Sequence, residues 1–201
     1  MINLNRAQIR QEIRRKRMEL CEKQQNNAAL KLLNHFSSDS RIIQAQHIAL
    51  YLTNDGELNT SPLIEWCWKQ NKNVYIPVIH PFSKGHLLFL KYTKETILIE
   101  NQYGIPEPKL DITAIILPKY LDIICTPLVA FDSRGNRLGM GGGFYDRTLQ
   151  SWHQQFQTNK NVKPFPVGIA HNCQYVDLLP CEQWDIPLPE VLTPGKHHKF
   201  S

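Results

Sequence analysis

The sequence predicts an α/β protein: a single domain with an open, mostly parallel sheet and helices on both faces, in a Rossmann-like three-layer arrangement. Short apolar runs of strand length alternate with helical patterns, and residues 47–79 form one complete strand–helix–strand unit. A chain of 201 residues with 42% apolar and 20% charged residues has the size and composition of one globular domain. We therefore assign residues 1–195 to one domain and residues 196–201 to a flexible C-terminal tail.

Two helices are expected before the first strand. Apolar residues recur every three to four positions from Leu4 to Leu20, with basic residues between them, and again from Gln24 to Phe36. The polar run at 37–40 should end the second helix. Residues 47–52 then form a short apolar run, which is typical of a buried strand.

The middle of the chain predicts the repeating element of a parallel sheet. The turn signal Asn54-Asp55-Gly56 separates the first strand from a helix that starts near Pro62. Strands are expected at 74–79 and 87–92, and the proline-rich stretch 104–108 is expected to be a loop.

The last part of the chain predicts a central strand followed by a loop and a helix. Residues 123–131 are an apolar run in which Pro127 indicates the strand's end, because proline cannot donate a ladder hydrogen bond. A glycine-rich loop at 132–143, a helix at 144–157 and a short strand at 166–170 follow. Ligands of open α/β sheets bind at the carboxyl ends of strands, where this loop and the loop after the first strand should meet.

Composition excludes several classes of protein. No apolar stretch approaches the ~18 residues of a membrane helix, and the start of the sequence lacks the apolar core of a secretory signal. The five cysteines are scattered without a C-x-x-C pair, so neither a disulfide framework nor a zinc site is predicted. We expect a cytoplasmic monomer with reduced thiols and no membrane partner.

The formal net charge is +5, and basic residues are concentrated at positions 6–17. Such a segment binds nucleic acid in some proteins, is a solvated helix face in most, or folds back onto a nucleotide phosphate. Arg14 and Arg17 are interpreted as solvated. No nucleic-acid partner is expected, because the segment lacks the interleaved aromatic residues of an RNA-binding surface.

The most informative motif is Arg137-Leu138-Gly139-Met140-Gly141-Gly142-Gly143-Phe144-Tyr145-Asp146-Arg147. Its glycines allow backbone N–H groups to converge on phosphate oxygens, helped by the positive end of the following helix. Arg137 can add a charge-assisted contact. Asp146 lies in the first turn of the expected helix, where the helix dipole favours a carboxylate. Alternatively, it binds Mg²⁺ beside the phosphates. The motif is neither a Walker A loop nor the dinucleotide fingerprint, and a plain strand-to-helix turn is the alternative.

This motif resembles the signature of 5-formyltetrahydrofolate cyclo-ligases. Three further segments match the family in the same order: Arg6-Ala7-Gln8-Ile9-Arg10, residues 51–60 and residues 184–194. The resemblance implies an ATP- and Mg²⁺-dependent ligase that cyclises 5-formyltetrahydrofolate to 5,10-methenyltetrahydrofolate. It implies ADP and phosphate as the other products, and a phosphorylated formyl (iminium phosphate) intermediate.

The resemblance also implies roles for individual residues. The ATP-binding positions correspond to Arg6, Ala7, Gln8, Ile9, Arg10, Arg137, Leu138, Gly139, Met140, Gly141, Gly142, Gly143, Phe144 and Tyr145. The folate-binding positions correspond to Leu52, Glu57, Met140, Gly141, Gly142, Gly143 and Phe144. Magnesium is assigned to Asp146 and Asp185, and catalysis to Arg137, Tyr145 and Asp146.

Two departures from the family pattern stand out. Many members have lysine or arginine where this chain has Met140 and Gly142, which puts more of the phosphate contact on the backbone and on the N-terminal arginines. Pro189 occupies a position that is often acidic in the family, and we assign it no metal role.

Two alternatives belong to other functional classes. One is a non-enzymatic protein that binds nucleotide or nucleic acid through the basic helix. The other is a different α/β enzyme, such as a sugar-phosphate isomerase, which would need a general base near the loop and no ATP. A metalloenzyme is disfavoured, because His197 and His198 lie in the tail that is expected to be flexible and the remaining histidines show no ligand spacing.

Overall fold

The computed structural model describes residues 5–200. The strands of its main sheet are β1 His47–Ala49, β2 Asn73–Ile79, β3 Leu87–Tyr92, β6 Ile115–Ile116, β7 Ile123–Pro127, β10 Phe165–Ile169, β11 Glu190–Leu192 and β12 His197–Lys199. Their order is β12-β11-β10-β7-β1-β2-β3-β6. The pairs from β11 through β10, β7 and β1 to β2 are parallel, whereas both edges are antiparallel. The predicted open, mostly parallel sheet is confirmed.

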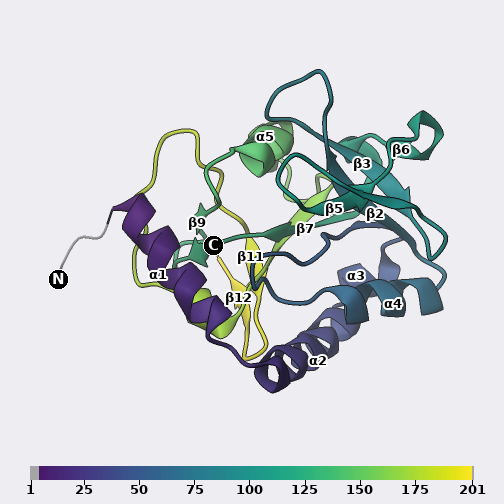
Figure 1. Cartoon of the computed structure of the whole chain (residues 1–201). Coiled ribbons are helices and arrows are strands. Elements are labelled where there is room, and N and C mark those ends of the chain that lie inside the picture. Colours follow the sequence, from purple (N-terminus) through teal and green to yellow (C-terminus); the bar gives the residue numbers. More distant parts are fainter. Residues whose placement is uncertain (1–4, 201) are drawn as a thin grey trace.

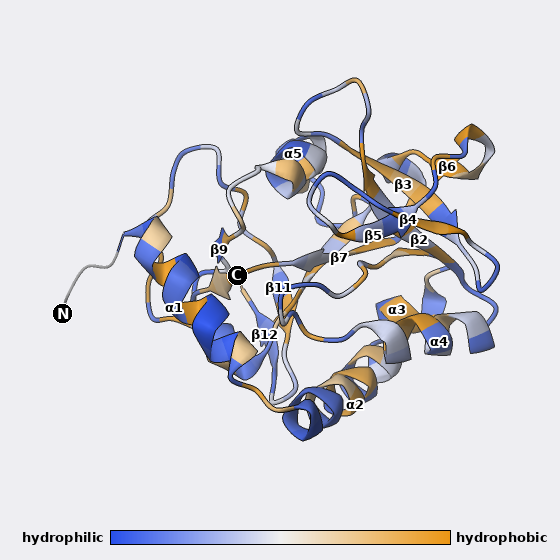
Figure 2. Ribbon diagram, in the orientation of Figure 1, coloured by the Kyte–Doolittle hydropathy of each residue, from blue (hydrophilic) through white to orange (hydrophobic). Residues whose placement is uncertain are grey.

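Helices cover both faces of this sheet, as predicted (Figure 1). The helices are α1 Arg6–Met18, α2 Glu22–Ser38, α3 Ser40–Gln44, α4 Ser61–Lys69 and α5 Phe144–Phe156. Successive side chains of a strand point to opposite faces, so Ile48 packs with α2, α3 and α4, while Ala49 packs on the side of α5. Fully burying one such large apolar side chain stabilises the fold by roughly 1.5–3 kcal/mol. Figure 2 shows hydrophobic residues along the central strands and hydrophilic residues on much of α1.

Helix α1 is fixed at its start by a capping box. The side chain of Asn5 accepts the Gln8 amide at 3.0 Å, and the Gln8 side chain accepts the Asn5 amide at 2.9 Å. Ile9 and Ile13 bury the inner face of the helix. Leu4, which the sequence places in this helix, lies outside the described residues. No helix among residues 5–200 is both long enough and apolar enough to cross a membrane.

The apolar run 123–131 forms two strands rather than the single strand expected. After Pro127 the chain turns and enters a hairpin of β8 Ala130–Phe131 and β9 Arg137–Leu138. Asp132 is buried and shapes the turn, because its Oδ1 accepts the amides of Arg134 at 2.9 Å and Asn136 at 3.1 Å. The second strand of this hairpin consists of Arg137 and Leu138, the first two residues of the glycine-rich motif.

Other segments also differ from the sequence prediction. The stretch expected to be a loop contains β5 Pro106–Pro108, which pairs with β4 Leu98–Glu100. Where only a break was expected, Asp39 caps the short helix α3 by accepting the Arg41 amide at 2.9 Å. The tail from residue 196, expected to be flexible, forms β12 and pairs with β11. Short 3₁₀ helices are found at Ile112–Ala114, Pro118–Tyr120 and Asn172–Gln174.

Candidate functional site

A cleft of about 910 Å³ opens beside the carboxyl ends of β1 and β7. It is lined by most of the predicted site residues: Arg6, Arg10, Leu52, Glu57, Arg137, Gly139, Met140, Gly141, Gly142, Gly143, Phe144, Tyr145, Asp146 and Asp185. Four predicted ATP-binding residues do not line it: Ala7, Gln8, Ile9 and Leu138. Ile9 and Leu138 are instead buried together under α1, and Gln8 belongs to the capping box.

The glycine-rich bend presents unpaired backbone donors to the cleft. Gly141 has φ +102° and Gly143 has φ +65°, conformations that favour glycine. A Cβ atom at Gly139 would meet nothing within 4 Å, so packing does not explain that glycine. In the described part of the chain, the amides of residues 139–143 donate no intramolecular hydrogen bond. Free amides before the N-terminus of α5 are the arrangement in which proteins bind phosphate oxygens.

Arg10 places a positive charge on this bend. Its Nε donates to the Gly139 carbonyl oxygen at 2.8 Å, and it forms no ion pair within residues 5–200. Burial and the neighbouring charge of Arg6 lower the pKa of Arg10. A guanidinium remains charged despite such a shift, so Arg10 is a cation available to an anionic ligand.

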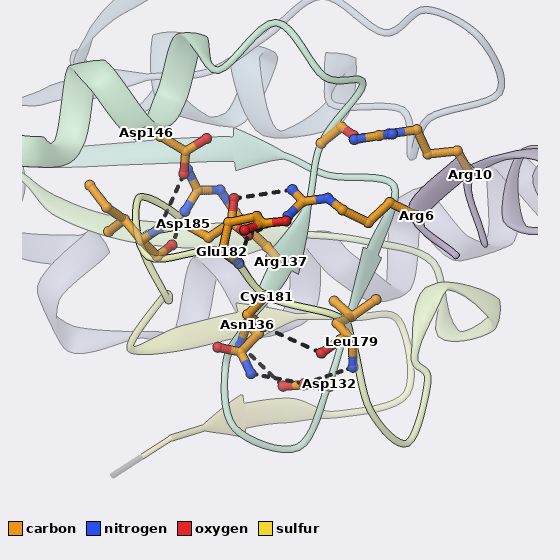
Figure 3. A network of polar contacts seen from close by, with 12 residues as sticks. Arg6, Arg10, Asp132, Asn136, Arg137, Asp146, Leu179, Cys181, Glu182 and Asp185 are labelled. Atoms are coloured by element: carbon orange, nitrogen blue, oxygen red, sulfur yellow. Dashed lines mark hydrogen bonds and ion pairs between the residues drawn. The ribbon is translucent and has the colours of Figure 1, made fainter. Parts of the chain in front are cut away.

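Arg137 and Asp146 are bound to one another. Arg137 is only 8% exposed, and its Nη2 donates to Asp146 Oδ1 at 2.7 Å (Figure 3). The other terminal nitrogen of Arg137 donates to the carbonyl oxygen of Ile186, whose amide donates to Asp146 Oδ1 at 3.2 Å. Burial lowers the pKa of Arg137, whereas the charge of Asp146 opposes this shift. Arg137 thus holds the acid at the start of α5 in place.

Asp185 is held by Arg6 from the first turn of α1. The two side chains form a forked pair, with nitrogen–oxygen distances of 2.6 and 3.1 Å, and the Glu182 amide donates to Asp185 Oδ2 at 2.8 Å. Burial raises the pKa of Asp185, but the hydrogen bonds from Arg6 and Glu182 and the charge of Arg137 hold it below its ordinary value. Asp185 is therefore an anion at neutral pH, on the same cleft wall as Asp146.

Glu57 lies on the opposite side of the glycine bend, in the loop after β1. Burial raises its pKa to about 7, although the charge of Arg17 acts in the other direction. Among residues 5–200 its side chain accepts one hydrogen bond, from the Asn54 amide at 3.3 Å. Burial and the charge of Glu57 raise the pKa of Tyr145, which therefore presents a neutral hydroxyl. The pair offers a cleft ligand one carboxylate and one phenol.

The interpretation of Arg17 as a solvated residue is wrong, whereas Arg14 is exposed, as expected. Arg14 lines the cleft and forms a forked ion pair with Asp55, while Arg17 is 1% exposed and binds the same carboxylate. Their spacing from Arg10, four and seven residues along one helix, is the signal that places all three on one face. Because Arg17 is buried and Arg14 is paired with Asp55, these two arginines give little support to a nucleic-acid-binding surface.

The ribbon of β4 and β5 adds a wall to the cleft that sequence patterns did not indicate. Asn101, Tyr103 and Glu107 line the cleft, and the Asn101 side chain donates to Glu107 Oε2 at 3.0 Å. Strand β5 lies in the stretch 104–108 that the sequence predicts to be a loop, because the prolines there conceal its short pairing with β4. Its half-apolar lining suits a flat organic ligand more than a bare anion.

Comparisons with known proteins identify the family to which the chain belongs. The model of the 5-formyltetrahydrofolate cyclo-ligase family matches residues 3–194. The chain is 51% identical over 187 residues to the 5-formyltetrahydrofolate cyclo-ligase of Haemophilus influenzae, covering 93% of this chain and 96% of that protein. It is 49% identical over 184 residues to the enzyme of that name from Escherichia coli K12, covering 92% and 97% of the two chains.

Solved structures give the same result. The 5,10-methenyltetrahydrofolate synthetase of Aquifex aeolicus superposes with a TM-score of 0.79 at 28% identity, covering 96% of this chain and 92% of that one. A synthetase of Mycoplasma pneumoniae, at 21% identity and a TM-score of 0.71, supports the fold. With its sequence motifs, its cleft and these relatives in agreement, the chain belongs to the 5-formyltetrahydrofolate cyclo-ligase family.

Proposed function

We propose that the protein uses ATP and Mg²⁺ to cyclise 5-formyltetrahydrofolate to 5,10-methenyltetrahydrofolate, releasing ADP and phosphate. The observation that carries the proposal is a single cleft with two chemically different walls. One wall has the unpaired amides of residues 139–143 and the cation of Arg10. The other has Leu52, Glu57 and Tyr145. The first wall suits a triphosphate and the second suits a pterin.

The triphosphate is assigned to the glycine bend. Its amides can donate to phosphate oxygens, and the N-terminus of α5 adds a favourable dipole. Many family members have a basic residue where this chain has Met140 and Gly142, and here Arg10 supplies positive charge at the bend instead. Arg6 lines the same cleft and is close enough to Arg10 to lower its pKa.

The pterin is assigned to the wall formed by the loop after β1. A carboxylate at Glu57 can accept hydrogen bonds from the ring N–H and amino groups of a pterin. The partly buried ring of Phe144 and the side chain of Leu52 supply flat and apolar surface beside it. The p-aminobenzoyl part of the folate then extends along the β4–β5 wall, near Tyr103.

Asp146 and Asp185 fit the oxygen ligands that magnesium prefers. Magnesium typically takes one or two carboxylates together with phosphate oxygens. Asp146 Oδ2 has no hydrogen-bond partner among residues 5–200, so Asp146 can bind a cation without leaving Arg137. Both oxygens of Asp185 accept hydrogen bonds from Arg6, and Oδ2 also accepts the Glu182 amide, so Asp185 is less free than Asp146 to bind a cation. When bound, the ion neutralises charge on the phosphates.

The reaction needs the two substrates to be positioned against each other, and it needs no nucleophile from the protein. The formyl oxygen attacks the γ-phosphorus, the bond to ADP breaks, and an iminium phosphate forms. Nitrogen N10 of the folate then attacks the activated carbon and loses its proton, and phosphate leaves. Arg10 and the bend amides hold the phosphates, and the Tyr145 hydroxyl donates toward the charge that develops between the two substrates.

The sugar-phosphate isomerase alternative needs a base at the glycine bend. The candidate base Glu57 instead lies on the pterin wall, which favours the cyclo-ligase reaction.

The test is a mixture of the protein, 5-formyltetrahydrofolate and Mg-ATP, followed by the absorbance band of the methenyl product. We expect the band to rise only when all three are present, with one ADP formed per product. Product formation without ATP, or ATP hydrolysis that does not depend on the folate, would contradict the proposal.

A further inference from the structure

Helix α1 carries a row of arginines that reach three different loops. Arg6 binds Asp185 in the segment before β11, and Arg10 binds the Gly139 carbonyl in the glycine bend. Arg14 binds Asp55, in the loop after β1, with nitrogen–oxygen distances of 2.7 and 2.8 Å. Residues spaced by three or four positions lie on one face of a helix, so one rigid element contacts both walls of the cleft.

Asp55 is where this helix meets the pterin wall. Its backbone is in the left-handed region at φ +51°, followed by Gly56 at φ +68°. Arg17 Nη2 donates to the Asp55 side chain at 2.7 Å and to its carbonyl oxygen at 2.8 Å. A Cβ atom at Gly56 would lie 3.0 Å from the sulfur of Met18, so the loop is also packed closely on the helix.

Asp55 is the counter-charge of a buried cation, the guanidinium of Arg17. Arg17 is 1% exposed, and burying an unpaired guanidinium would be costly. His171 adds no second positive charge beside Arg17, because burial and the charge of Arg17 lower the pKa of His171 to about 4 and the ring is neutral. Hydrogen bonds from Arg14 and the charges of both arginines lower the pKa of Asp55 below its ordinary value, in spite of its partial burial.

Glu57 belongs to the same turn as Asp55. The Glu57 amide donates to the Asn54 carbonyl oxygen at 2.9 Å, and the Asn54 amide donates to the Glu57 carboxylate at 3.3 Å. These two bonds close the turn around Asp55. A shift of α1 relative to the sheet therefore moves Asp55 and, through the turn, the carboxylate of Glu57.

From this geometry we propose that Asp55 is a positioning residue that couples nucleotide binding to folate binding through Arg14 and Arg17. A nucleotide that draws Arg6 and Arg10 onto its phosphates fixes α1, and α1 fixes the Glu57 turn through Asp55. The inference rests on the proposed function, since it needs both ligands in the one cleft. Thermodynamic linkage makes the effect reciprocal, so each ligand increases the affinity of the protein for the other ligand by the same factor.

The experiment compares the dissociation constant of 5-formyltetrahydrofolate with and without a non-hydrolysable ATP analogue and Mg²⁺. In the unmodified protein we expect the analogue to tighten folate binding by about fivefold or more, as in typical coupled sites. Asp55→Asn keeps the shape but removes the charge, and should bring this ratio close to one. Arg14→Gln added to Asp55→Asn should cause no further loss, because both act through the same pair.

The matched control is Glu12→Gln, which removes the ion pair of Glu12 with Lys16 on the same helix, at 2.8 Å. It should leave the ratio unchanged, and thermal unfolding should show every variant folded. If the unmodified protein binds neither ligand, whether offered alone or together, the proposed function fails, and the coupling with it. If both ligands bind but Asp55→Asn keeps the full ratio, or the double variant loses much more, the role of Asp55 is overturned and the proposed function stands.

Discussion

Nη2 of Arg137 lies 2.7 Å from Oδ1 of Asp146, so a buried cation holds the acid that we assign to magnesium. The two residues are nine positions apart in the sequence, and the whole glycine bend lies between them. The ion pair therefore closes the bend at its base. It also means that changes at Asp146 affect both the metal site and the packing of Arg137.

Replacing Asp146 by asparagine should lower turnover about 100-fold or more and raise the magnesium concentration needed for half-maximal rate. An amide is a poor ligand for magnesium in place of a carboxylate. We also expect a loss of stability of about 1–3 kcal/mol, because Arg137 keeps a hydrogen-bond acceptor but loses its counter-charge. Initial rates across a magnesium titration, with Asp111→Asn as an exposed control, measure the effect. Unchanged turnover would remove Asp146 from the metal site.

Arg10→Ala should raise the KM for ATP about tenfold or more, and the KM for folate much less. The side chain lines the cleft at the glycine bend, whereas the other cation of the bend, Arg147, donates to the Gly142 carbonyl oxygen and is not part of the cleft lining. Arg15→Ala is the matched control, since Arg15 pairs with Glu19 on the exposed side of the same helix. Steady-state kinetics with each substrate varied in turn gives both constants. Equal rises in the two constants would contradict the assignment of Arg10 to the phosphates.

Folate binding should depend on pH through Glu57. Because the pKa of Glu57 is raised to about 7, its carboxylate is increasingly protonated as the pH falls below that value, and loses acceptors for the pterin. The KM for folate should therefore rise between pH 8 and pH 6. In Glu57→Gln it should be on the order of tenfold higher at pH 8 and show little of this pH dependence. The same pH profile in both proteins would remove Glu57 from the pocket.

Glu57 should also lower the free energy of unfolding at neutral pH. The folded pKa of about 7 lies above the ordinary value of 4.5, so the penalty for ionised Glu57 is absent below pH 4.5, grows up to pH 7 and is complete above it. Glu57→Gln should then be more stable than the unmodified protein at pH 8, on the order of 1–2 kcal/mol, and equally stable near pH 4. Denaturant unfolding at the two pH values tests this sign. If Glu57→Gln is less stable than the unmodified protein at pH 8, ionised Glu57 carries no desolvation penalty in the folded protein.

Tyr145→Phe tests the catalytic role of the phenol. A neutral donor aimed at developing charge in a water-poor cleft acts on turnover more than on binding. We expect turnover to fall about tenfold while the KM for ATP changes little. Single-turnover rates with saturating substrates separate the two effects, and Tyr103→Phe on the opposite cleft wall is the control. A rise in KM alone would make Tyr145 a binding residue.

Local pattern predicted much of the architecture. The helices at 6–18, 22–38 and 61–69 and the buried central strands follow from spacing of apolar residues, which is a property of neighbouring positions. The pairing of β12 with β11 and of β4 with β5 was not predicted, because strands of three residues carry too little pattern and depend on partners elsewhere in the chain.

The sequence by itself determined the glycine bend, the acid at the start of α5 and the arginine-rich first helix, since each is a contiguous motif with its own chemistry. Only the tertiary structure decided what those arginines contact. Arg6 and Asp185 are 179 positions apart, and Arg17 became a buried partner of Asp55 when α1 packed against the loop after β1. Such pairs form because burying a charge requires a counter-charge, and the chain's path through space decides which one is near.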